Sequence, residues 1–361
     1  MRCGTAYLAL LLIIAFSPPA AASGPALVFE ATSGKVLYAE GADNQWYPAS
    51  LTKMMTAYLA FEAIKSGRLS LKSKISCSAT AHAEPPSKIG LPIGGELTVD
   101  KALQALIVKS ANDVAVMLAE AIGGNEQQFV NLMNVTAKRL GMTRTHFVNA
   151  NGLPAAEQMT TARDLAKLAR VIITEYPEYD HYWSMPHMRL GKNRLRSHNG
   201  LLRSLEGADG FKTGFTCDSG FNIIASATRD GNRLVAVVLG DPSSAERNVR
   251  AASLIEYGFQ KYGWAQIFNY KTVDSMPLKP TATGVTSVRQ TVDSWGCNPK
   301  KKKKKARVTS HGKRDKRAAK KKPTSDKPAV ASSAQEVGGD IGVGIDLSAP
   351  ELRSPLGLAQ P

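Results

Sequence analysis

Cysteine and histidine are scarce in this sequence, with four and six among 361 residues. They do not cluster at the spacing of metal ligands, so we expect neither a metal centre nor another cofactor. Cys3 lies before an apolar run at the N-terminus, and the other three cysteines are Cys77, Cys217 and Cys297. This odd number argues against a disulfide framework, although one bridge and one free thiol would fit it. The sequence alone does not pair them.

The apolar run at the N-terminus, Ala6 to Phe16, is too short to span a bilayer comfortably. It follows Met1-Arg2 and precedes a run of small residues that ends at Ser23. This order is typical of a signal peptide, so we expect residues 1–23 to be removed on export. The protein would then lie in the periplasm or the cell envelope. An uncleaved N-terminal anchor is the alternative.

Acidic residues are outnumbered, with 30 Asp and Glu against 46 Lys and Arg. Much of the imbalance lies in residues 300–322, which hold 14 Lys and Arg against one Asp. Such a run repels itself and buries no apolar surface, so residues 299–361 are expected to be a disordered tail. The tail could contact an anionic wall or membrane, or be a solvated extension without function. No nucleic-acid-binding motif accompanies it, so nucleic acid is not an expected partner.

Between these ends, residues 24–265 have the pattern of one globular catalytic domain, and residues 266–298 are expected to be a linker. The domain begins with two short apolar runs, 26–30 and 36–39, which predict a hairpin. Residues 65–200 are mostly helical in pattern.

Two helical patterns dominate the middle of the domain, over residues 99–122 and 125–140. Strand patterns return over residues 221–228 and 233–240, on either side of an Asp-Gly turn, and predict a second hairpin. A closing helix is expected over residues 246–262. This order predicts an α+β fold, in which helices flank an antiparallel sheet and also form a largely helical lobe.

Ser50 and Lys53 lie three residues apart at the start of a predicted helix, so their side chains share one face. A serine hydroxyl becomes a good nucleophile only when a base takes its proton. A lysine amine that is partly buried among other cations has a lowered pKa and can act as that base. An ordinary helix-capping serine followed by a solvated lysine is the alternative for this pair taken alone.

Ser110 and Asn112 precede an apolar helical run. At such a place a hydroxyl can relay a proton to a leaving amine, and an amide can bind a substrate amide. Simple capping of the following helix is the alternative. The neighbouring Lys109 and Asp113 are interpreted as a solvated pair.

Lys212, Thr213 and Gly214 lie just before a predicted strand. An edge strand can pair with an extended peptide through its backbone, and a glycine lets that peptide approach closely. Lys212 would supply a positive charge and Thr213 a hydroxyl for a carboxylate. A solvated lysine in a glycine-rich turn is the alternative.

The three motifs occur together, in the order known from penicillin-binding proteins and class A β-lactamases. Around them the chain resembles the serine D-alanyl-D-alanine carboxypeptidases, the low-molecular-mass penicillin-binding proteins of peptidase family S11. The resemblance runs from about Ala26 to Tyr262, and its most similar segments lie within residues 47–56, 140–154 and 207–216. It implies a β-lactamase/transpeptidase-like fold.

The resemblance also implies an activity, which is removal of the terminal D-alanine from peptidoglycan pentapeptide stems through an acyl-enzyme on Ser50. β-Lactam antibiotics would be covalent inhibitors. The backbone N–H groups of Ser50 and Phe215 would form the oxyanion hole, and Arg247, with Arg250 as the alternative, would help to bind the substrate carboxylate. The other implied roles are Lys53 as general base, Ser110 and Asn112 in proton relay and substrate binding, and Lys212, Thr213 and Gly214 facing the substrate.

Other functions remain open at this point. The same residues would serve a D,D-endopeptidase that cuts peptidoglycan cross-links. A β-lactamase is less favoured, because no clear Glu-x-x-Leu-Asn element is present to position a deacylating water. A wall-binding protein without activity would leave the three motifs unexplained. Well-known relatives carry a β-rich second domain and an amphipathic membrane anchor, whereas the residues after the catalytic domain here contain no convincing amphipathic helix.

Overall fold

The computed structural model describes the whole of the predicted catalytic domain and part of the predicted linker. The predicted signal peptide, residues 1–23, and the predicted tail, residues 299–361, lie outside the described residues. The described residues are 24–268, 271–282, 284–292 and 297.

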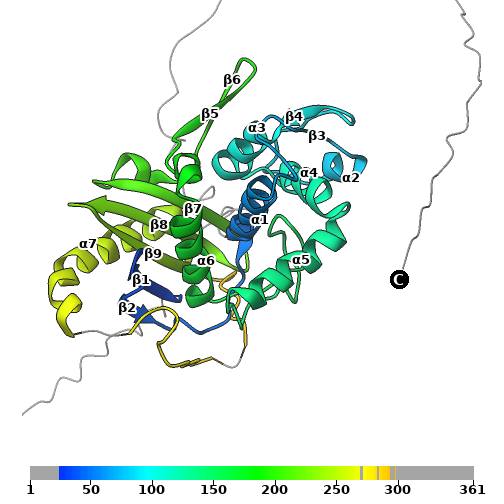
Figure 1. The fold of residues 1–361 in the computed structure, drawn as a ribbon. Coiled ribbons are helices and arrows are strands. Elements are labelled where there is room, and N and C mark those ends of the chain that lie inside the picture. Colours follow the sequence, from blue (N-terminus) through cyan, green and yellow to red (C-terminus); the bar gives the residue numbers. More distant parts are fainter. Residues whose placement is uncertain (1–23, 269–270, 283, 293–296, 298–361) are drawn as a thin grey trace, which may run out of the picture. The chain divides into compact units, whose positions relative to one another are not determined.

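An antiparallel sheet of five strands forms the centre of this part of the chain, with the strand order β2-β1-β9-β8-β7 (Figure 1). Both predicted hairpins are present, as β1–β2 and β8–β9. Strand β1 pairs with β9, which joins the two ends of the domain in one sheet, while β7 lies at an edge. The strands are β1 Ala26–Glu30, β2 Val36–Glu40, β7 Ala208–Thr216, β8 Gly220–Arg229 and β9 Asn232–Asp241.

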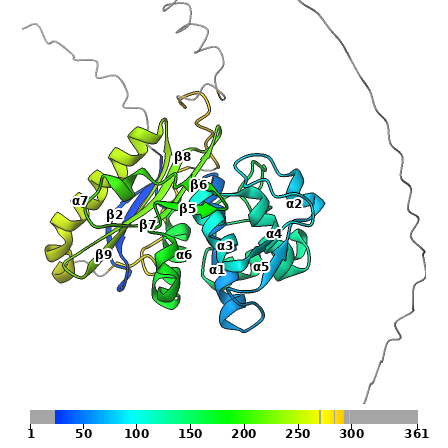
Figure 2. The ribbon, with the colours of Figure 1, turned by 90° about the horizontal axis from the view of Figure 1, so that it is seen from above.

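Alternate residues of the strands face two different apolar clusters. Val28 and Ile223 belong to the cluster that includes helix α7, and Phe29 and Val237 belong to the cluster that includes α1 and α6 (Figure 2). Because both faces are covered, the central strands are apolar along most of their length instead of alternating. These helices are α1 Lys53–Lys65, α6 Ala162–Glu175 and α7 Ser244–Phe268.

A helical lobe lies beside the sheet (Figure 2). The helix predicted over residues 99–122 is not continuous, because Ser110 has a left-handed backbone with φ 60°. Core-facing apolar residues lie on both sides of this break, so the apolar period alone did not reveal it. The lobe contains α2 Ala79–Ala83, α3 Val99–Gln104, the π-helical turn η2 Ala105–Lys109, α4 Asn112–Gly123 and α5 Glu126–Arg139, with a small sheet of β3 Lys74–Ser76 and β4 Glu96–Thr98.

Short elements between α6 and β7 lead the chain back to the sheet. Strands β5 and β6 form a hairpin that the mostly helical pattern of this region did not predict, and it projects from the body in Figure 1. The elements are the 3₁₀ turn η3 Pro177–Tyr182, β5 His187–Leu190, β6 Asn193–Arg196 and the 3₁₀ turn η4 Gly200–Arg203; a further turn, η1 Ala49–Thr52, precedes α1.

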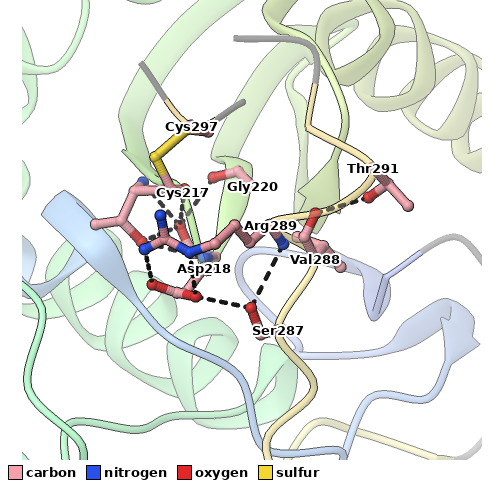
Figure 3. Close-up of a disulfide and its surroundings, with 10 residues drawn as sticks. Cys217, Asp218, Gly220, Ser287, Val288, Arg289, Thr291 and Cys297 are labelled. Atoms are coloured by element: carbon pink, nitrogen blue, oxygen red, sulfur yellow. Dashed lines mark hydrogen bonds and ion pairs between the residues drawn. A yellow bond between two sulfur atoms is a disulfide. The ribbon is translucent and has the colours of Figure 1, made fainter. Parts of the chain in front are cut away.

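The described part of the predicted linker packs against the domain. Helix α7 continues to Phe268, and the side chains of Val273 and Val292 beyond it are fully buried. A disulfide joins Cys217, in the turn between β7 and β8, to Cys297 (Figure 3). Of the compatible cysteine arrangements, the structure therefore has the one with a single bridge, and Cys77 is a buried free thiol. Within the described residues, no helix is both long and apolar enough to cross a membrane.

Candidate active site

Ser50 lies in turn η1, and the chain enters helix α1 directly at Lys53. The Lys53 side chain is buried, and its Nζ lies 3.1 Å from Oγ of Ser50. The same Nζ donates hydrogen bonds to Oδ1 of Asn112 at 2.8 Å and to the carbonyl oxygen of Asn151 at 2.5 Å. A neutral amine has two N–H donors and one lone pair. With the donors directed to Asn112 and Asn151, the lone pair is free to accept the Ser50 proton.

Burial lowers the pKa of Lys53 well below its usual value, and the nearby charge of Lys212 lowers it further. Glu84 and Asp113 act in the opposite direction. Burial dominates because the charged ammonium loses more hydration than the neutral amine when water is excluded. The neutral form of Lys53, which a general base requires, is therefore accessible at a lower pH than for an exposed lysine.

Lys212, on strand β7, is the second buried lysine of the site. Its Nζ donates hydrogen bonds to Oγ of Ser110 at 2.8 Å and to the carbonyl oxygen of Thr213 at 3.0 Å. Burial, together with the positive charge of Arg247, lowers the pKa of Lys212 to about 7. Lys212 can therefore gain or lose its charge near neutral pH.

Asn112 is fixed in place from both its backbone and its side chain. Its backbone N–H donates to the carbonyl oxygen of Ser87 at 2.7 Å, and its Nδ2 donates to that of Pro85 at 2.9 Å. With Nδ2 bound in this way, Oδ1 faces Lys53. The side-chain amide therefore orients the Lys53 amine.

Two glycines allow other segments to approach the Ser50 turn closely. A Cβ on Gly214 would lie 3.1 Å from the backbone nitrogen of Ser50, which brings the edge strand β7 against the turn. Gly152 has φ +86°, and a Cβ there would lie only 1.9 Å from the carbonyl oxygen of Ala49. Only glycine fits this conformation and this spacing.

These elements surround one cavity of about 510 Å³. Lys53 and Lys212 do not line the cavity themselves. Each lies behind a serine that does, because Nζ of Lys53 contacts Ser50 and Nζ of Lys212 contacts Ser110. Arg250, the alternative to Arg247, does not line it and instead binds the carbonyl oxygen of Gly24 at 2.7 Å. The predicted residues that line the cavity are Ser50, Ser110, Asn112, Thr213, Gly214, Phe215 and Arg247.

This arrangement coincides with a known family. Residues 13–243 match the family model of D-alanyl-D-alanine carboxypeptidases. The chain belongs to this family of serine hydrolases. The family predicted from the sequence and the transpeptidase-like fold are thus confirmed.

Individual carboxypeptidases and penicillin-binding proteins agree with this assignment. The D-alanyl-D-alanine carboxypeptidase DacD of Salmonella typhimurium is 38% identical over 260 residues, which are 70% of this chain and 66% of that protein. The chain thus spans just under two thirds of that relative's length. The crystal structure of penicillin binding protein 6B from Escherichia coli is 36% identical, with a TM-score of 0.64 over 70% of this chain and 82% of that one. Penicillin-Binding Protein D2 from Listeria monocytogenes, in a cefotaxime-bound form, is 34% identical with a TM-score of 0.60 and covers 66% and 97% of the two chains.

The sequence did not indicate a role for several residues of this site. Asn151 and Gly152 lie in a segment that resembles the family, but only the fold reveals that they contact Lys53 and the Ser50 turn. His198, which lines the cavity, had no motif to mark it. The interpretation of Asp113 as part of a solvated pair with Lys109 was wrong, because its buried carboxylate accepts hydrogen bonds from the backbone of the 89–90 segment.

Proposed function

We propose that this carboxypeptidase releases the terminal D-alanine of peptidoglycan pentapeptide stems through an acyl-enzyme on Ser50. The single observation that supports this most is the position of the buried Lys53 amine, 3.1 Å from the Ser50 hydroxyl. A poor nucleophile and a base of lowered pKa within hydrogen-bonding distance are what acyl transfer to serine requires.

In the first step, Oγ of Ser50 attacks the carbonyl carbon of the penultimate D-alanine while the neutral amine of Lys53 takes the hydroxyl proton. The backbone N–H groups of Ser50 and Phe215 bind the developing oxyanion. The C–N bond to the terminal D-alanine then breaks, and the leaving nitrogen receives the proton that Lys53 took from Ser50, relayed by the hydroxyl of Ser110, which Lys212 holds in place. A water molecule hydrolyses the resulting ester on Ser50 and restores the free serine.

The terminal carboxylate of the substrate selects the peptide end. Thr213 offers a hydroxyl in the cavity, Arg247 a guanidinium, and Lys212 an ammonium that donates to Ser110 at the cavity wall. Three such donors favour a free carboxylate over the amide of a longer chain, because hydrogen bonds to a charged acceptor are stronger than those to a neutral one. This favours a carboxypeptidase over an endopeptidase.

The experiment is covalent labelling with a fluorescent penicillin, followed by mass spectrometry of products from purified peptidoglycan. We expect label on Ser50, release of free D-alanine and intact cross-links. Cleavage of cross-links without free D-alanine would indicate the endopeptidase instead. Release of D-alanine by Ser50→Ala at the wild-type rate would exclude the acyl-serine mechanism.

We also propose that the chain is exported and that the lysine-rich tail tethers it to an anionic wall or membrane surface. The support is compositional, since residues 300–322 hold 14 Lys and Arg against one Asp. Attraction of this kind is screened by salt. Deletion of residues 299–361 should reduce recovery with the envelope fraction at low salt, and unchanged recovery would contradict the tether.

A further inference from the structure

A second cavity, of about 330 Å³, adjoins the candidate active site. Gly152, Leu153 and Thr216 line both cavities, so the second one continues the first past the end of strand β7. Its walls come from the Ser50 turn, the 152–158 segment and the β7–β8 turn. The proposed mechanism uses none of this space.

Asp218 is the one residue with a formal charge among those that line the second cavity. Hydrogen bonds from Arg289 and Ser287 lower its pKa, so the carboxylate is ionised at neutral pH. Oδ1 accepts from Ser287 and Arg289, while Oδ2 accepts from Arg289 at 2.7 Å. An ionised carboxylate can accept about four hydrogen bonds, so capacity remains for a ligand.

The strap, defined as residues 284–292, holds Asp218 in this position (Figure 3). Besides the side-chain contacts, the backbone N–H of Val288 donates to the carbonyl oxygen of Asp218 at 3.0 Å. The neighbouring Cys217 is bonded to Cys297. The strap lies beyond residue 243, where the match with the family model ends. Asp218 is thus fixed by contacts from outside the segment that defines the family.

The path of the substrate, which rests on the proposed function, leads to this cavity. A terminal carboxylate near Thr213 and a scissile carbonyl near Gly214 place the peptide antiparallel to β7, along its free edge. The residue before the two D-alanines then lies near Thr216. Asp218 is two residues further, in the β7–β8 turn, so it lies at most about 7 Å away at about 3.3 Å per residue, which a long side chain can reach.

We propose that the second cavity binds the side chain of the residue that precedes the two D-alanines, and that this side chain ends in an ammonium group bound by Asp218. The chemistry follows from the lining, in which the Asp218 carboxylate is the single charged group. Arg289 offsets part of the negative charge from the strap side, so the preference for a cation is modest.

The test compares two peptides that differ by one charge, Nα-acetyl-L-lysyl-D-Ala-D-Ala and its Nα,Nε-diacetyl form. We expect kcat/KM to be about three- to ten-fold higher for the peptide with the free amine, mainly because its KM is lower. This is the size of effect that one charged hydrogen bond has when it is partly exposed to solvent. Asp218→Asn should remove this difference and leave the diacetyl peptide unchanged. Asp274→Asn is the matched control, because it removes an exposed carboxylate that pairs with Arg170 instead.

The rate of Ser50 labelling by a small penicillin reports folding and the acyl-transfer chemistry independently of the second cavity. If the wild-type protein is labelled normally at Ser50 but has the same kcat/KM for both peptides, the second cavity is not a cation site, and the proposed function still holds. A preference that survives Asp218→Asn would overturn the role of Asp218. Failure of Ser50 to be labelled would instead overturn the proposed function.

Discussion

Nζ of Lys212 donates a hydrogen bond of 2.8 Å to Oγ of Ser110, which connects the edge strand of the sheet to the break between η2 and helix α4. Lys53 makes the corresponding connection from helix α1 to Asn112, also at 2.8 Å. The two buried amines thus join three distant segments around Ser50. A change in the charge of either amine should affect the whole site, which makes pH a direct probe.

We predict that kcat/KM falls above about pH 7, with the change mainly in KM. Burial and the charge of Arg247 lower the pKa of Lys212 to about 7, so its positive charge is lost as the pH rises through that value. Binding of the substrate carboxylate then weakens, by up to about ten-fold per pH unit. On the acid side, protonation of Lys53 should lower kcat. Steady-state kinetics from about pH 5 to about pH 10 would measure both limbs.

Lys212→Arg is the control for the alkaline limb, because a guanidinium stays protonated across this range. The variant is expected to be slower, since the fork of Arg does not reproduce the contact with Ser110. Its KM should nevertheless stay flat above pH 7. If KM of this variant rises above pH 7 as much as KM of the wild type does, the loss of activity at alkaline pH comes from titration of a group other than Lys212.

Gly152→Ala should destabilise the protein and slow acylation of Ser50. The new Cβ would lie 1.9 Å from the carbonyl oxygen of Ala49, at a residue whose φ is +86°. Backbone strain and displacement of the Ser50 turn together should lower the free energy of unfolding by about 2–5 kcal/mol. Urea unfolding and the rate of penicillin labelling would measure the two effects.

Gly67→Ala separates strain from steric contact. Gly67 has φ +75°, and a Cβ there would meet nothing within 4 Å. Strain alone should lower the free energy of unfolding by about 1 kcal/mol and leave penicillin labelling unchanged. Equal losses for the two variants would show that close approach to the Ser50 turn does not matter.

The parts of the site that could be predicted from the sequence are those within one short motif. Ser50 and Lys53 share a helical face because of their spacing. The contact of Lys53 with the carbonyl of Asn151 joins residues 98 positions apart, so no local sequence pattern predicts it. The left-handed backbone at Ser110 was missed for a related reason, since apolar residues continue through the break and maintain the period.

The fold was predictable where hydrophobic patterning determines local structure, as in the hairpins β1–β2 and β8–β9. It was not predictable in the segment after α7, which was expected to be a linker. There Val273 is buried against residues far away in the sequence, and a few such contacts leave no periodic signal. The pairing of Cys217 with Cys297, which are 80 positions apart, likewise depends on the folded structure alone.

The disulfide should be detectable and stabilising. A sample without residues 1–23 should yield a linked Cys217–Cys297 peptide on digestion. One thiol, that of Cys77, should react with a maleimide after unfolding, and three reactive thiols would contradict the pairing. Cys217→Ser with Cys297→Ser should lower the free energy of unfolding by about 2–4 kcal/mol, because the bridge restricts a long loop of the unfolded chain. Reductant should destabilise the wild type but not this double variant.

Arg163→Met should cost more stability than the loss of a surface ion pair. The Arg163 guanidinium lies 2.7 Å from Asp43 with both side chains buried, and it donates to the carbonyl oxygens of Met276 and of Pro277. The variant keeps an apolar stem of similar length but leaves the Asp43 carboxylate buried without its cation. We expect a loss of about 3–5 kcal/mol in the free energy of unfolding, together with faster proteolysis within residues 271–282.

The matched control for that variant is Arg170→Met, on the same helix α6. Arg170 pairs with Asp274 at 3.4 Å, and both side chains are partly exposed, so we expect less than about 1 kcal/mol. Adding Asp43→Asn to Arg163→Met should recover part of the lost stability, because the buried charge is removed. If Arg163→Met and Arg170→Met cost the same, or if Asp43→Asn brings no recovery, the buried pair does not hold the segment after α7 to the domain.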